Sequence, residues 1–135
     1  MNYKRVPVVC VPLLGIVAAL MMAGCSMTVS AESVYGSYVA SYPFGTDTIS
    51  LNRDGTFVQQ VAIKQQEPVT VRGIWEFDPT ESRATFYGAM IVADGFDHLR
   101  NDWRTVTKGI VSLDVERRWF RVLMGSAATY PYMKQ

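Results

Sequence analysis

The sequence predicts an all-β protein, a single antiparallel meander of about seven or eight strands closed into a barrel; a β-sandwich is the alternative. Short runs that alternate apolar and polar residues recur along the chain, as in strands with one buried face. Clusters of Gly, Pro, Asn and Asp separate these runs. No stretch has the 3.6-residue periodicity of a long amphipathic helix. Consecutive hairpins favour the up-and-down barrel.

The first 24 residues have the pattern of a signal peptide. Lys4 and Arg5 form a positive segment, residues 6–22 an apolar segment, and 23–25 the small-residue sequence Ala-Gly-Cys. Two prolines interrupt the apolar run, which is at the short end of the roughly 20 residues that a membrane-spanning helix needs. A cleaved signal is therefore favoured over a retained anchor.

The sequence Met-Ala-Gly-Cys at 22–25 resembles the lipobox of bacterial lipoproteins. The resemblance implies lipidation of Cys25, with acyl chains such as palmitate, and attachment to a membrane through this residue. By resemblance to Gram-negative lipoproteins, Ser26 rather than Asp after the cysteine implies sorting to the periplasmic face of the outer membrane. The alternative is a soluble periplasmic or secreted protein cut after Ala31, because Val29-Ser30-Ala31 has the small-residue spacing of ordinary signal peptidase sites.

The remaining chain divides into a short polar tether, 25–33, and one domain, 34–135. Cys10 lies in the signal segment and Cys25 in the lipobox, so no disulfide is expected, and the domain must rely on its hydrophobic core. Removing Lys4 and Arg5 from the 13 basic residues leaves 11 against 12 acidic ones, a net charge of −1. This balance argues against nucleic acid as a partner.

The first half of the domain predicts four strands, and Asp54-Gly55 predicts a tight hairpin turn in which Gly takes positive φ. In the fourth strand a glycine, Gly73, predicts a bulge, a bend or a close backbone approach. The expected ranges are 36–42, 46–51, 57–63 and 69–77.

The second half predicts a strand over 83–92, a long connection over 93–108, and strands over 109–115 and 119–124 with a turn at Arg117-Arg118. Residues 125–135 are expected to contain an edge strand that closes the sheet. A connection as long as 93–108 is usually functional or ordered by its own side chains. Any specificity is therefore expected in this loop.

Three short motifs carry a further resemblance: Gly36-x-Tyr38, Asp54-Gly-Thr-Phe57 and Gly73-x-Trp75. They resemble small bacterial lipocalin-like domains over about 40 residues of the mature chain. The resemblance implies a calyx-like barrel in a lipoprotein family largely without assigned function. It supplies no catalytic residue.

The long loop contains the only histidine, His98, among three aspartates. A His held by a carboxylate can act as a general base, and aspartates can ligate a cation. However, the spacing departs from calcium loops, and no His/Cys cluster suits zinc. We therefore expect no catalytic residue, no metal and no cofactor, and we select the loop residues as candidate contacts to a ligand or partner: Asp97, His98, Arg100, Asp102 and Trp103.

Gln59 and Trp75 are two further candidates, both on the expected inner faces of strands. Gln59 shares its face with Phe57 and Val61, so it is either a polar anchor in a ligand cavity or a core amide bonded to backbone. Trp75 is either core or cavity lining. Near the end of the chain, three arginines flank Trp119 and can meet the anionic group of a partner: Arg117, Arg118 and Arg121.

These observations predict a non-enzymatic outer-membrane lipoprotein whose barrel binds a small amphipathic ligand or an envelope protein. The alternative is an inhibitor of a lytic enzyme such as lysozyme. Residues 125–130, with Ser126 and Tyr130, weakly resemble the Ser- and Tyr-containing loop of periplasmic lysozyme inhibitors. An enclosed cavity of at least roughly 300 Å³ with Gln59 in its wall would favour the carrier.

Overall fold

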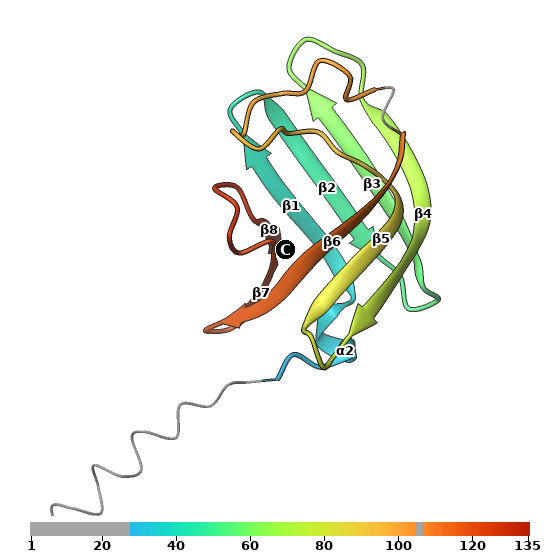
Figure 1. The fold of residues 1–135 in the computed structure, drawn as a ribbon, viewed down its shortest axis with the longest axis vertical. Coiled ribbons are helices and arrows are strands. Elements are labelled where there is room, and N and C mark those ends of the chain that lie inside the picture. The colour runs from blue at the N-terminus through green and yellow to red at the C-terminus, as the bar shows by residue number, and fades with distance from the viewer. Residues whose placement is uncertain (1–27, 105–106) are drawn as a thin grey trace, which may run out of the picture.

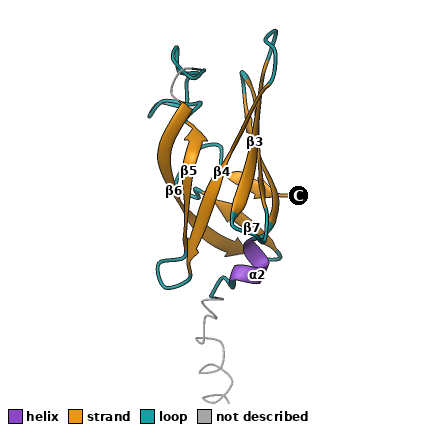
Figure 2. Ribbon diagram, turned by 90° about the vertical axis from the view of Figure 1, so that its right-hand side faces the viewer, coloured by secondary structure: helices purple, strands orange, loops and turns teal. Residues whose placement is uncertain are grey.

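The computed structural model describes residues 28–104 and 107–135, which form a closed barrel of eight antiparallel strands in chain order (Figure 1). The predicted all-β meander barrel is confirmed. Figure 2 shows that the regular secondary structure is almost entirely strand, joined by loops, with one short helix, α2, at one end. The elements are α2 (Ala31–Val34), β1 (Gly36–Tyr42), β2 (Gly45–Leu51), β3 (Thr56–Ile63), β4 (Val69–Asp78), β5 (Arg83–Met90), β6 (Thr107–Arg118), β7 (Arg121–Met124) and β8 (Tyr132–Lys134).

The predicted turn and close approach in the first half are both present. Gly55 has φ of 81°, and the Asp54 carboxylate accepts a hydrogen bond from the backbone N–H of Thr56 at 2.9 Å. At Gly73, a Cβ atom would lie 2.2 Å from the carbonyl oxygen of Tyr87 and 2.6 Å from the ring of Phe57. Only glycine lets β4 pass this closely between its neighbours.

The predicted boundaries in the second half are shifted. β6 begins at Thr107 rather than at 109, so the connection expected over 93–108 is 91–106. The strand expected over 83–92 ends at Met90, because a register shift at Gly88, with φ of 90°, bends β5 and turns both Ala89 and Met90 inward. The turn expected at Arg117-Arg118 comes two residues later. Arg118 pairs with Arg121, so the tip of the β6–β7 hairpin is Trp119-Phe120.

Strand polarity separates the connections into two ends of the barrel. At the N-terminal end lie α2 and the short connections 52–55, 79–82 and 119–120. At the loop end lie 43–44, 64–68, 91–106 and 125–131. The long 91–106 connection and the β6–β7 hairpin are thus at opposite ends.

Two hydrophobic clusters fill the barrel. The larger one, towards the N-terminal end, contains Phe57, Trp75, Phe86 and Met124. The smaller one, towards the loop end, is built around Trp103 and receives Val92 from the same connection. Residues of the long connection therefore form part of the core.

The packed part of the chain reaches back into the expected tether. Val29, just before α2, and Val34, the last residue of α2, are buried in the larger cluster. Within the described ranges, no helix is both long and apolar enough to cross a membrane. The expected signal peptide and Cys25 lie outside the described residues.

Candidate functional site

A buried polar cluster lies inside the barrel between the two hydrophobic clusters. Asp47 on β2 is 1% exposed and Gln59 on β3 is 0% exposed. The Gln59 amide donates to the Asp47 carboxylate at 2.8 Å and to the carbonyl of Met90 at 3.1 Å, and it accepts from the N–H of Met90 at 2.7 Å. Tyr132 on β8 donates its hydroxyl to the same Asp47 oxygen at 2.6 Å. The cluster joins β2, β3, β5 and β8.

Burial controls the protonation of this cluster. Loss of solvation raises the pKa of Asp47 from 3.8 to about 6, although the hydrogen bonds from Tyr132 and Gln59 favour the carboxylate. Its second oxygen, Oδ1, receives no hydrogen bond from the described residues. Burial, followed by the nearby Asp47 charge, raises the pKa of Tyr42 to about 12 and that of Tyr132 well above its usual range. Asp47 is thus the group here that titrates closest to neutral pH.

A cavity of about 130 Å³ adjoins this cluster. Gln59 and the hydroxyl-bearing Tyr42 and Tyr132 contribute polar groups to its wall. The rest of the wall is mostly apolar and includes Ile49, Phe86, Ala89, Met90, Val92, Val111 and Leu113. An apolar chamber with a few placed polar groups is the usual composition of a small-molecule site. The volume is below the roughly 300 Å³ expected of a typical ligand pocket.

The cavity faces the part of the barrel wall that has the fewest strand pairs. β7 pairs with β6 only over residues 115–118, and β8 pairs with β1 only at Tyr38 and Val39. Over the loop-end half, the segment 125–131 links β7 to β8 beside β1 (Figure 1). The cavity is lined there by β6 residues on one side and by Tyr42 and Tyr132 on the other. This side of the cavity is thus the part of the wall least closed by strand pairing.

The predicted loop residues lie at the loop end and bond mainly to one another. The His98 ring nitrogen Nδ1 lies 3.7 Å from the carboxylate of Asp94, rather than beside the carboxylate of Asp97 or Asp102. The Asp94 carboxylate also accepts the backbone N–H of Phe96 and of His98, and these bonds lower its pKa. Asp97 takes positive φ, 61°, in the same turn. The loop side chains nearest His98 therefore order the turn itself.

Arg100 and Asp102 form a two-point ion pair with both N–O distances at 2.9 Å. Trp103 is buried, and the guanidinium of Arg104 lies over its ring at 4.8 Å. Among the described residues, no group of three or more His, Cys, Asp or Glu side chains could hold a metal ion. None of the predicted loop residues lines the cavity that Gln59 lines.

Trp75 does not line the cavity; it lies in the cluster at the N-terminal end, paired across β4 and β5 with Phe86, which does. Its indole N–H donates to the carbonyl of Asn52 at 3.1 Å, and Tyr35 packs edge-on against it at 5.7 Å. Of the predicted contacts, Gln59 is the one in the cavity wall. Ser126 donates to Glu116, and Tyr130 packs against Tyr42 at 5.4 Å.

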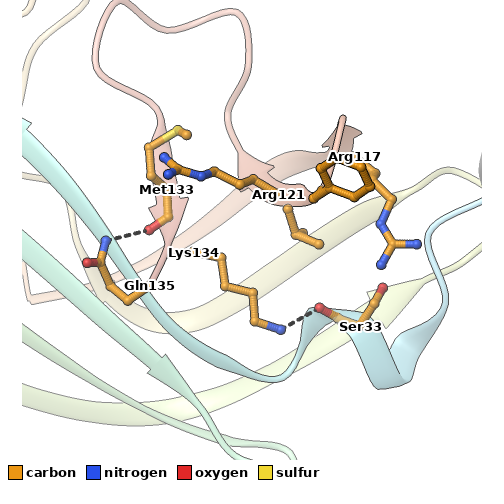
Figure 3. A pocket seen from close by; sticks show the side chains of 8 residues that line it. Ser33, Arg117, Arg121, Met133, Lys134 and Gln135 are labelled. Carbon is orange, nitrogen blue, oxygen red and sulfur yellow. Dashed lines mark hydrogen bonds between the residues drawn. The ribbon is translucent and has the colours of Figure 1, made fainter.

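A second hollow, of about 550 Å³, lies at the N-terminal end beside the β6–β7 hairpin (Figure 3). Three cations surround it: Arg117, Arg121 and Lys134. The Lys134 ammonium donates to the carbonyl of Ser33 at 2.6 Å, and burial, followed by the charge of Arg117, lowers its pKa. This hollow is open and cationic, whereas the internal cavity is mostly apolar.

Sequence reasoning missed Asp47, Tyr42 and Tyr132. Asp47 is two residues before Ile49 and four before Leu51, both buried, so its side chain is on the same face of β2. Alternation alone could therefore have placed it inside the barrel. Tyr132 had no such signal, because its position depends on a three-residue strand that pairs back to β1.

Comparisons with protein-family models, with curated proteins and with solved structures find no match to this chain. The assignment of a site therefore depends on the geometry of the barrel.

Proposed function

We propose that this protein is a non-enzymatic, lipid-anchored protein of the bacterial outer membrane whose barrel binds part of a small amphipathic ligand. The observation that carries the proposal is the internal cavity, whose mostly apolar wall contains polar groups from Gln59, Tyr42 and Tyr132. The anchor is Cys25, proposed from the lipobox-like sequence.

The cavity limits the size of the bound group. An apolar cavity of about 150 Å³ holds benzene in another protein, so about 130 Å³ suits a group no larger than one small ring or a short branched chain. The remainder of a larger ligand would extend through the wall between β6 and β1, where strand pairing stops. A hydrogen-bond donor on the inner group would meet the Tyr132 hydroxyl oxygen, because both N–H groups of the Gln59 amide are already donated to Asp47 and Met90.

Native mass spectrometry of the protein purified from its own envelope tests both parts of the proposal. We expect acyl mass on Cys25 and, separately, a non-covalent adduct. Val111→Phe should remove the adduct, because Val111 lines the cavity and a ring there would fill it. Ile110→Phe is the matched control, since Ile110 is the adjacent residue on β6 but is exposed outside the barrel.

Two results would contradict the proposal separately. The proposed ligand site is contradicted if the unmutated protein carries no adduct, or if the adduct persists in the Val111→Phe protein. An unacylated chain beginning at Glu32 contradicts the lipid anchor. The ligand site is still tested by the adduct measurement.

A further inference from the structure

A cationic and aromatic surface lies at the N-terminal end of the barrel. We define the hairpin surface as Arg117, Trp119, Phe120 and Arg121 of the β6–β7 hairpin, together with Lys134 of β8. We propose that the hairpin surface docks the barrel onto an anionic phospholipid bilayer, with Trp119 and Phe120 in the headgroup region and the arginines facing lipid phosphates. The inference rests on the lipid anchor proposed at Cys25.

The two aromatic side chains at the tip make no contribution to the core. Trp119 is 89% exposed and Phe120 is 96% exposed. They occupy a two-residue hairpin turn, where Asn-Gly is favoured, and Trp119 has φ of 57°. This left-handed conformation costs a side-chain-bearing residue about 1 kcal/mol. Folding therefore does not explain this pair, whereas a headgroup layer, in which Trp is enriched, does.

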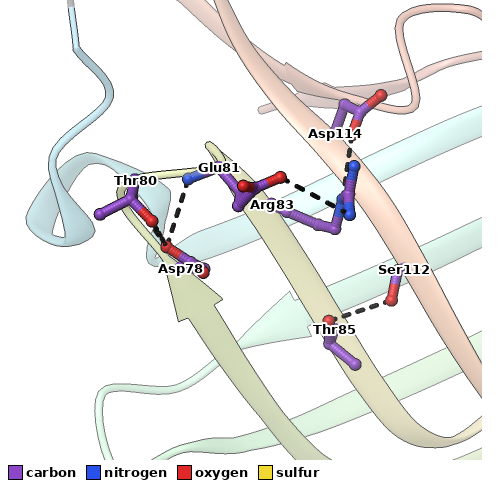
Figure 4. A network of polar contacts seen from close by, with 7 residues as sticks. All are labelled: Asp78, Thr80, Glu81, Arg83, Thr85, Ser112 and Asp114. Carbon is purple, nitrogen blue, oxygen red and sulfur yellow. Dashed lines mark hydrogen bonds and ion pairs between the residues drawn. The ribbon is translucent and has the colours of Figure 1, made fainter.

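The charges of the hairpin surface are not neutralised within the described chain. Arg117 and Arg121 have no carboxylate within the 4.0 Å ion-pair distance among the described residues. At the same end, Arg83 pairs with Asp114 at 3.3 Å and with Glu81 at 3.9 Å (Figure 4). Clustered cations without acidic partners create a positive potential that attracts anionic lipid.

The hollows on the two sides of the hairpin match the two parts of a phospholipid. The 550 Å³ hollow gathers Arg117, Arg121 and Lys134, as a phosphate requires. A second hollow, of about 390 Å³, is lined largely by apolar groups from Trp119, Phe120, Leu123, Pro131 and Met133. A cationic and an apolar surface therefore lie side by side on one hairpin, as at a membrane interface.

The position of the anchor brings this end of the barrel to the bilayer. Three residue steps separate Cys25 from Thr28, a reach of at most about 10 Å. Val29 is already buried in the barrel, and Ser33 of α2 lines the cationic hollow. Acyl chains on Cys25 would thus hold the hairpin surface close to the lipid phosphates.

The test uses the acylated protein reconstituted into vesicles of phosphatidylcholine alone or with about 30% phosphatidylglycerol. Brominated acyl chains quench nearby indoles, and subtracting the Trp119→Phe protein isolates the signal of Trp119. We expect about twofold quenching of Trp119 in the anionic vesicles and little in the neutral ones. Added salt should reduce it, because exposed charges are screened.

Charge variants then separate docking from tethering. Arg117→Gln with Arg121→Gln should abolish the quenching while the acyl chains keep the protein on the vesicles. Arg72→Gln is the control, because Arg72 is exposed on β4 away from the hairpin. Amide exchange should slow at residues 117–121 on anionic vesicles and stay unchanged at 94–102.

The docking proposal is overturned if the acylated protein shows no Trp119 quenching, or if quenching is equal in neutral and anionic vesicles. It is also overturned if amide exchange at the hairpin slows only when an envelope protein is added. The mass of the N-terminal peptide is read from the same sample. A missing acyl group therefore counts against the anchor, and the vesicle result counts separately for or against the surface.

Discussion

The two ends of the barrel use their polar and aromatic side chains in opposite ways. At the loop end, the long 91–106 connection pairs His98 with Asp94 and Arg100 with Asp102, and it inserts Trp103 into the core. At the N-terminal end, a two-residue turn exposes Trp119 and leaves its flanking arginines, Arg117 and Arg121, without carboxylate partners among the described residues.

The comparison teaches that a long connection can bond most of its own side chains to one another, whereas a short one does not always do so. The long loop was expected to carry specificity, yet its described side chains largely satisfy one another and cap one end of the barrel. The short hairpin cannot satisfy its own side chains, because only two residues separate its strands and both point to solvent. Arginines without a carboxylate partner among the described residues and two adjacent exposed rings therefore gather at the two-residue β6–β7 turn rather than in the long connection.

The largest expected effect comes from truncating Trp103, the buried tryptophan at the loop end. Trp103→Ala should lower the free energy of unfolding by about 3 to 5 kcal/mol, because it empties a buried site in the smaller cluster. Phe96→Ala, in the same connection but exposed, should change it by less than about 0.5 kcal/mol. Urea denaturation measures both. A small loss for Trp103→Ala would mean that the loop does not close the barrel.

The next effect lies between the two ends, at Asp47. Its folded pKa of about 6 lies above its usual 3.8, so the folded state binds the proton more tightly than the unfolded chain. The contribution of Asp47 to the free energy of unfolding is therefore most favourable below about pH 4. It falls by up to about 3 kcal/mol as the pH rises through 6. The Asp47→Asn protein has no titratable group at this position. The difference in free energy of unfolding between this variant and the unmutated protein should therefore shift in favour of the variant as the pH rises from 4 to 6.

Urea denaturation at intervals from pH 4 to pH 8 checks this prediction. Asp94→Asn is the matched control, because Asp94 is exposed and its pKa is lowered rather than raised. Parallel stability curves for the unmutated protein and Asp47→Asn would show that the interior carboxyl does not govern the pH dependence.

The smallest effect sharpens the comparison at the hairpin. Trp119→Gly should raise the free energy of unfolding by up to about 1 kcal/mol, because glycine adopts positive φ without steric cost. Thermal unfolding measures the gain, and the same variant should lose vesicle docking. A destabilised Trp119→Gly protein would mean that the exposed ring supports the fold after all.

Much of the fold could be predicted because alternation is local. Residues in β3 and β4 repeat their inward face every second position, and Asp54-Gly55 specifies the turn between β2 and β3. The boundary errors have local causes as well. The bulge at Gly88 shifts the phase of β5, and Arg118 pairs with Arg121 although both are charged.

The candidate site could be predicted only in part. Gln59 was identified because an amide on an apolar face is visible in one strand. Its partners, Asp47 and Tyr132, are 12 residues before it and 73 residues after it in the chain. Their hydrogen bonds form only when the barrel closes.

The sequence by itself determined the strand order, the inner and outer faces of the strands and the tight turn, because each depends on neighbouring residues. Tertiary structure decided which polar groups meet inside the barrel, since β8 must return to β1 to bring Tyr132 to Asp47. It also decided which charges remain uncompensated. Ion pairing depends on distance in space, and no local pattern distinguishes Arg83, which finds Asp114, from Arg121, which finds no carboxylate among the described residues.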